Sequence, residues 1–179
     1  METLIILGLL VILFSIWLTL TRRKLATLEE NVKNAMGQIG IQISSRQDMT
    51  AALTEMVRDY AVPEKQPLAD VFYSRRKIIT AASTVEQVQD QEQLVEAILK
   101  QLTSLEETYP ELQKKQNYVS CKEAANSYRK MVHTSCLIYN DSVSQINRAI
   151  KKLPTSFLAG MLGFHQKEYL ELDKDEENE

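Results

Sequence analysis

The sequence has few residues of the kinds that build disulfide, metal or catalytic sites. It contains two cysteines and two histidines in 179 residues. Cys121 and Cys136 lie in one predicted helical segment, where about 22 Å of helix separates them, so they cannot pair within it. Free thiols fit a reducing compartment or plain packing roles, and composition leaves both interpretations open.

The two histidines are not placed for metal chemistry. A di-iron carboxylate site in a helical bundle needs Glu-x-x-His motifs, but Lys130 and Leu162 stand three residues before His133 and His165. His133 and Cys136 share one helical turn, yet two further zinc ligands are missing at any sensible spacing. No nucleophile elbow, Cys–His signature or Gly-rich phosphate loop is present. We therefore assign no catalytic, cofactor-binding or metal-binding residue and expect a protein that is not an enzyme.

Proline and glycine are also scarce, and they mark breaks between segments. Each of the four prolines falls where a helical pattern starts or stops: Pro63, Pro67, Pro110 and Pro154. No stretch shows the sustained two-residue alternation or hairpin turns of a sheet protein. The sequence therefore predicts an all-α fold.

What is abundant is an uncharged apolar run over residues 4–20, closed by Arg22, Arg23 and Lys24. About 20 such residues in a helix rise about 30 Å, which matches the hydrocarbon thickness of a bilayer. A cleaved signal peptide carries its positive charges before the apolar region, whereas here Glu2 precedes it and the bases follow. A buried core helix would need a more apolar remainder to cover it.

We therefore predict a transmembrane anchor with a basic stop-transfer triplet over residues 1–24, with residues 4–21 in the lipid. Because positive charges stay on the cytoplasmic side, we expect the N-terminus outside and the long remainder in the cytoplasm. That remainder is nearly neutral outside its C-terminal end, which argues against nucleic acid as a partner.

Apolar residues at spacings of three and four predict an antiparallel four-helix bundle over residues 25–153, with helices at about 23–60, 67–82, 85–108 and 110–153. The first is expected to continue from the anchor, because no proline or glycine lies between Leu20 and Met36. Ser83-Thr84 predicts an N-cap on the third helix, with Glu86 or Gln87 as the reciprocal partner in a capping box. Gly37 and Gly40 predict a close helix contact or a hinge on the first helix, with tolerated glycine as the alternative.

The chain ends in two segments of opposite character. Residues 154–165 are apolar, and they either cap the open end of the bundle or lie in the membrane interface. Residues 166–179 hold seven acids against two lysines and predict a disordered acidic tail.

Several of these segments resemble the LemA family of bacterial proteins. The residues that carry the resemblance are Asn31-Val32 through Gln38-Ile39, Gln42-Ile43, Tyr109-Pro110-Glu111-Leu112, Tyr139-Asn140, Ile150-Lys151-Lys152-Leu153-Pro154, Ala159-Gly160-Met161-Leu162-Gly163-Phe164 and Tyr169. The sequence departs from the family pattern at Met49–Leu53, where a Leu-Ile-Pro-Asn-Leu segment after paired arginines is usual and only Arg46 is present. Met36 also replaces a usual Trp, and Leu153-Pro154 replaces a usual Phe-Pro. The resemblance implies an N-terminal membrane anchor that carries an antiparallel four-helix bundle, and it implies no catalytic activity.

Three classes of function follow as hypotheses. The first is a membrane-tethered interaction or scaffold module with unidentified protein partners. In it, the fourth helix returns to the bilayer, so that Arg148, Lys151 and Lys152 join Arg22, Arg23 and Lys24 at anionic headgroups. The second is a membrane-associated assembly of identical chains. The third, an enzyme or metal-binding bundle, has the least support.

Overall fold

The computed structural model describes residues 1–58 and 68–172, and every regular element in these ranges is helical. The elements are α1 (Glu2–Met56), α2 (Leu68–Arg75), α3 (Val85–Thr108), the 3₁₀ helix η2 (Pro110–Lys114), α4 (Gln116–Lys151) and α5 (Thr155–Ala159). The predicted all-α fold with a long apolar N-terminal helix is confirmed. Pro63 and Pro67, which mark the predicted break between the first two helices, and the acids from Asp173 onward lie outside the described residues.

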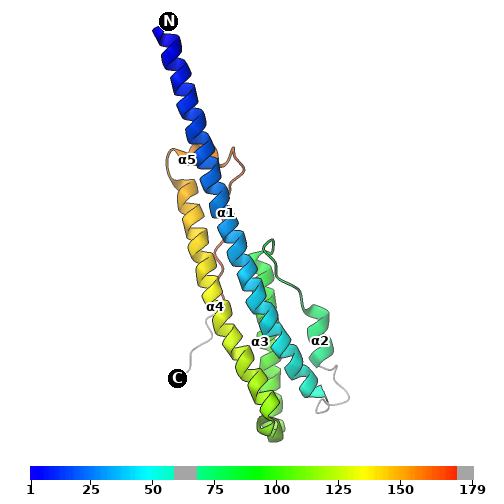
Figure 1. The fold of residues 1–179 in the computed structure, drawn as a ribbon. Helices are drawn as coiled ribbons and strands as arrows, with labels where there is room; N and C mark the ends of the chain where they lie inside the picture. Colours follow the sequence, from blue (N-terminus) through cyan, green and yellow to red (C-terminus); the bar gives the residue numbers. More distant parts are fainter. Residues whose placement is uncertain (59–67, 173–179) are drawn as a thin grey trace.

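Helix α1 is one uninterrupted helix of 55 residues. Its first part stands free of the rest of the molecule, as Figure 1 shows, and its apolar side chains are exposed there. The second part begins at Leu25, where the first buried side chain of the helix appears. The expected continuity of anchor and first bundle helix is thus present, because nothing in the sequence between them breaks a helix.

Helix α4 runs back along α1 and provides its main packing partner (Figure 1). Two apolar cores result. The anchor-side core joins the two helices with the C-terminal segment and contains Leu25, Val32, Ile39, Val132, Tyr139, Ile146, Phe164 and Leu170 among others. The distal core joins them with α2 and α3 and contains Leu53, Phe72, Val95, Ile98, Leu102, Tyr118 and Ala125 among others.

The bundle is less regular than four equal helices, because α2 is short. We expected a second helix to residue 82, but α2 ends at Arg75 and an extended segment follows. Side chains of other helices hold the backbone of this segment: the Lys77 amide donates to Gln91 Oε1 at 2.7 Å, and Gln47 Nε2 donates to the Lys77 carbonyl at 3.4 Å. These tertiary bonds outweigh a helix propensity that is weak in a short element.

Gly40 lets this extended segment cross α1. A methyl group at Gly40 would lie 2.2 Å from the carbonyl oxygen of Ile79, whereas one at Gly37 would meet only the Ala81 side chain at 3.8 Å. The expected close contact is therefore made at Gly40, against extended chain and not against a helix. Gly37 fits the alternative of a tolerated glycine.

Local signals at the ends of α3 behave as predicted. The Thr84 hydroxyl accepts from the Gln87 amide, and the Gln87 side chain accepts from the Thr84 amide, so the capping box is complete. After α3, Pro110 opens η2 and not a full α-helix turn, and α4 begins at Gln116. The predicted break is present, with the fourth helix starting later than expected.

Candidate membrane interface and interior polar sites

The exposed apolar part of α1 is the first candidate site. Its most apolar 18-residue window has a mean hydropathy of 2.7 and none of it is buried, which leaves it long and apolar enough to cross a membrane. A soluble protein rarely exposes so large a contiguous apolar surface. Arg22, Arg23 and Lys24 follow it, all exposed, immediately before the buried Leu25. The helix therefore changes from an apolar surface to a packed core within a few residues, across a band of positive charge.

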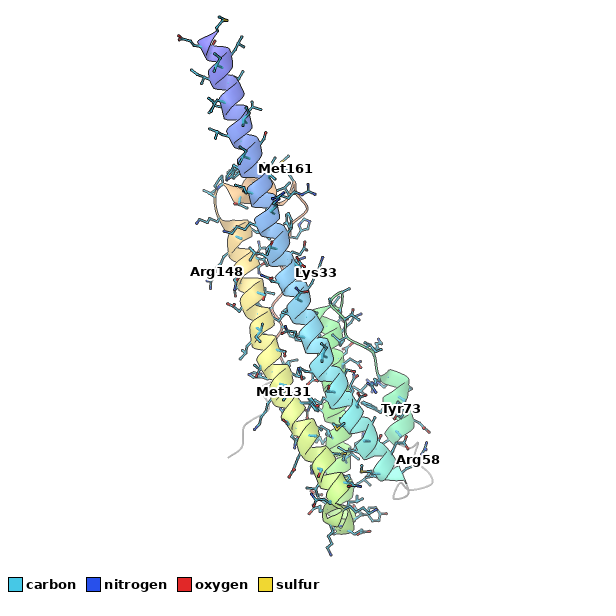
Figure 2. All side chains as sticks on the ribbon, viewed as in Figure 1. Lys33, Arg58, Tyr73, Met131, Arg148 and Met161 are labelled. Atoms are coloured by element: carbon cyan, nitrogen blue, oxygen red, sulfur yellow. The ribbon has the colours of Figure 1, made fainter. Side chains whose placement is uncertain are left out.

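In Figure 1 the α5 region lies at the level along α1 where this apolar run ends. Within residues 1–24 only Trp17, Leu18 and Thr21 are partly covered, and the centre of the Trp17 ring lies 5.7 Å from that of the Phe14 ring in the same helix. In Figure 2 Met161 lies at this level along α1, while Arg148 lies at the level of Lys33, farther along the rod. By "rod" we mean α1 from Leu25 onward together with α2, α3 and α4.

The sequence left two alternatives for the apolar segment 154–165, a cap on the end of the bundle or a surface in the membrane interface. Its side chains divide into a buried set and an exposed set. Ala159 and Phe164 are buried in the anchor-side core and close the end of the bundle. Phe157 and Met161 point away from it, with 76% and 84% of their surfaces exposed, and Leu153 is 67% exposed. The segment therefore caps the bundle with one set of residues and presents a separate apolar surface with the other.

The C-terminal segment 166–172 forms the second site, and it differs from expectation. We predicted disorder from residue 166, but this extended stretch packs along α4. Asn147 donates to the Lys167 carbonyl at 2.9 Å and accepts from the Lys167 amide at 2.8 Å. Asn140 makes the same pair of bonds to Leu170, each at 2.8 Å. Leu170 is buried in the anchor-side core, which fixes the segment from the other side.

The spacing of the two asparagines explains why they can hold an extended chain. Seven helical residues rise about 10.5 Å, and three extended residues span about 10 Å. The two pairs of hydrogen bonds, which we call the asparagine clamps, therefore stay in register. Two further contacts add to them: Tyr139 donates to the Glu168 carbonyl at 3.1 Å, and Lys167 Nζ pairs with Glu29 of α1 at 2.6 Å. The hydrogen bond from Lys167 lowers the pKa of Glu29, against the opposing effect of partial burial.

A buried ion cluster at the junction of three helices is the third site. Arg46 of α1 is fully buried and pairs with Glu92 and Glu96 of α3, and Glu96 also lies 3.5 Å from Arg129 of α4. Burial raises the pKa of Glu92, although Arg46 opposes this effect. Among the described residues, Arg46 Nε and Glu92 Oε1 are buried without a hydrogen-bond partner.

A cleft lies between α3 and α4. It has a volume of about 460 Å³ and is lined in part by Glu96, Lys100, Glu106, Tyr118 and Lys122. Tyr118 and Lys122 both donate to Glu106, at 2.8 Å and 2.7 Å. Burial raises the Tyr118 pKa, and the hydrogen bond to Glu106 and its charge raise it further. These acids and bases neutralise one another, which suits a structural contact better than acid–base chemistry.

The thiol and imidazole groups singled out in the sequence do not form a site. Cys136 is buried in the anchor-side core, and burial raises its pKa to about 12, while His133 on the same helix is exposed. Among the described residues, no group of three or more His, Cys, Asp or Glu side chains is placed to hold a metal ion.

Sequence reasoning missed two of these sites. The partners of Arg46 are about 50 positions away in the chain, and no local pattern connects them. The asparagine clamps had one signal, since Tyr139-Asn140 was among the residues that carry the family resemblance. Both members of that pair bind the C-terminal segment.

Comparison with known proteins agrees with the resemblance. No curated protein matches the chain significantly. A family model described as LemA family matches residues 35–179, which is most of the chain and includes all of the rod beyond the first turns, α5 and the C-terminal segment. The chain therefore belongs to the LemA family.

Proposed function

We propose that this protein is a single-pass membrane protein whose α1 spans the bilayer with residues 4–21 and holds the rod at the cytoplasmic face of a bacterial membrane. The observation that carries the proposal is the single helix of 55 residues that has no buried residue in its apolar run and a buried face from Leu25 onward. Such a helix transmits the position of the membrane directly to the bundle, because no flexible joint lies between them.

Two other uses of the apolar run have less support. The core helix of a soluble protein would be covered, whereas this window is uncovered. A cleaved leader would have to be cut from a helix that continues without a break into the anchor-side core. The cytoplasmic orientation is supported by Arg22, Arg23 and Lys24 at the rod side of the run.

Within this role, the rod acts by binding protein partners and not by catalysis. The buried charged side chains of the rod are paired with other charged side chains, and its long sides are the surface available to partners. A second candidate, assembly of identical chains, is supported by exposed apolar side chains on α4, namely Met131, Leu137 and Ile138. The mass of the purified chain in detergent separates the two, since an assembly module gives oligomers and an interaction module for other proteins gives a monomer.

Protease protection tests the orientation. Proteinase added outside intact cells should leave the rod whole, and proteinase added to inverted membrane vesicles should digest it. A matched variant with Arg22, Arg23 and Lys24 each changed to Gln should weaken this asymmetry without altering the rod, because all three side chains are exposed. Digestion of the rod from outside intact cells would reject the cytoplasmic orientation.

A further inference from the structure

We propose that the α5 region is a second membrane contact, in which Phe157 and Met161 enter the lipid interface while Lys151 and Lys152 bind anionic phospholipid headgroups. This inference rests on the proposed membrane anchor, because α1 fixes where the lipid surface lies. It assigns a partner, an anionic bilayer, to an apolar surface that the rod leaves uncovered.

The depth of the α5 region is the first argument. The apolar run of α1 ends just before Arg22, where the exposed basic triplet begins. In Figure 1 α5 lies at this level along α1. A segment at the level where α1 leaves the proposed lipid span lies at the lipid edge, so α5 can meet the bilayer without any movement of the rod.

The division of side chains is the second argument. Phe157 and Met161 are four residues apart and are the two most exposed large apolar side chains of segment 154–165, while Ala159 and Phe164 turn inward. A buried group and an outward apolar group in one short stretch are typical of an amphipathic interfacial segment. Exposed to water, an aromatic and a Met side chain would each forfeit the free energy that burial in acyl chains provides.

Charge is the third argument and selects the kind of lipid. Residues 148–165 contain three basic residues and no acid. Lys151 and Lys152 are exposed immediately before the apolar surface, and Arg22, Arg23 and Lys24 stand exposed on α1. Basic residues close to an anionic surface are attracted to it, and the attraction falls off within a Debye length. Arg148 lies farther from the apolar run in Figure 2 and therefore contributes less.

Tryptophan fluorescence in full-length chains reconstituted in vesicles tests this contact. The only tryptophan is Trp17, so a Trp17→Phe background allows single probes at Phe157→Trp, Met161→Trp and, as a control on α2, Tyr73→Trp. The vesicles contain phosphatidylcholine brominated high on its acyl chains and a minor fraction of phosphatidylglycerol. We expect blue-shifted emission and several-fold stronger quenching for probes at 157 and 161 than for the probe at 73.

Wild-type chains, in which Trp17 is the only tryptophan, distinguish failure of the second contact from failure of the membrane anchor. If Trp17 is quenched but probes at 157 and 161 emit like the probe at 73, the second contact is rejected and the apolar surface is free for a protein partner. If Trp17 itself is not quenched, the membrane anchor of the proposed function fails as well.

Charge variants test the headgroup part of the inference. Lys151→Gln with Lys152→Gln should lower the ratio of lipid-bound to unbound α5 roughly thirtyfold, which the quenching of the probe at 157 reports. This factor follows from about 1 kcal/mol for each basic residue near an anionic surface. The matched change Arg148→Gln should have a clearly smaller effect. Equal effects of the two changes, or equal quenching in vesicles of pure phosphatidylcholine, would reject anionic headgroups as the ligand.

Discussion

Among the glycines of α1, Gly40 is the one that another part of the chain approaches most closely. The carbonyl of Ile79 occupies the place where a side chain would begin, so the crossing of segment 76–84 depends on a missing methyl group. Gly37 lies one turn away on the same helix and faces an ordinary contact with Ala81. The two glycines therefore separate the effect of close approach from the effect of helix propensity.

We expect Gly40→Ala to destabilise the protein by about 1–3 kcal/mol, because the backbone at Ile79 must move to make room. Gly37→Ala, the matched control, should be neutral or stabilising by up to about 1 kcal/mol, since alanine favours a helix and finds space here. Urea denaturation of the detergent-solubilised chain measures both. Equal effects of the two substitutions would contradict the contact at Gly40.

Arg46 is the second residue on which packing depends. It compensates Glu92, which is almost as deeply buried, and Glu96, which is partly exposed and can turn toward water. Arg46→Met should cost about 3–5 kcal/mol at neutral pH, because it leaves the Glu92 carboxylate buried without its partner. Adding Glu92→Gln to this variant should restore much of the loss, since the buried charge is then removed as well. A double variant as unstable as Arg46→Met would show that the arginine acts through packing and not through charge.

The raised pKa of Glu92 gives this cluster a pH dependence of known sign. The folded state holds the Glu92 proton more tightly than the unfolded state, so the free energy of unfolding should decrease as pH rises above 4.5 and through the folded pKa. Glu92→Gln should remove this part of the decrease. The measurement is the urea midpoint at several pH values, and an unchanged pH profile in the variant would contradict a raised pKa.

At the scale of elements, sequence patterns predicted what depends on nearby residues. The capping box of α3 was predictable because Thr84 and Gln87 are neighbours, and the continuity of α1 followed from the absence of helix breakers. The end of α2 was not predictable, because Gln47 and Gln91, which hold the extended chain at Lys77, come from two other helices. The C-terminal segment was missed for the same reason: its acidic composition suggests disorder, but distant asparagines bind its backbone.

The C-terminal segment gives a prediction for one element. Asn147→Ala removes the acceptor of the Lys167 amide and the donor to its carbonyl, so protection of that amide against hydrogen exchange should fall about tenfold. Ser144→Ala, which loses only a contact of 3.2 Å with the Tyr169 hydroxyl, is the matched control and should change protection little. Unchanged exchange in the Asn147 variant would contradict the clamp.

Acid should loosen the same segment. The pKa of Glu29 is lowered by Lys167, so their attraction is complete above the unfolded pKa of about 4.5 and is lost as pH falls through the folded value. Exchange of residues 164–172 should therefore rise below about pH 4.5 relative to a Lys167→Met variant, in which this pair is absent. The same pH dependence in both chains would show that Glu29 is not responsible.

At the scale of the whole molecule, one helix, α1, contains both the exposed apolar run and the packed residues from Leu25 onward. The apolar part of α1 was evident from composition, as was the seam of α4, because both patterns extend over many turns. The division of the α5 region into inward and outward side chains was not evident, since glycines and short turns there break the periodicity. The proposed role of the protein requires the free end of α1 to lie in lipid.

Alkaline carbonate extraction of cell membranes tests that claim most directly. We predict that the wild-type chain stays in the membrane pellet, and that Leu9→Lys with Leu13→Lys moves it to the soluble fraction, since each charge near the bilayer centre costs about 2.5–3.5 kcal/mol. Both leucines are exposed, so the rod should keep its fold, and Met131→Lys with Leu137→Lys is the matched change on the rod that should leave the chain in the pellet. A wild-type chain extracted by carbonate, or a lysine variant that stays in the pellet, would contradict the membrane-spanning role of α1.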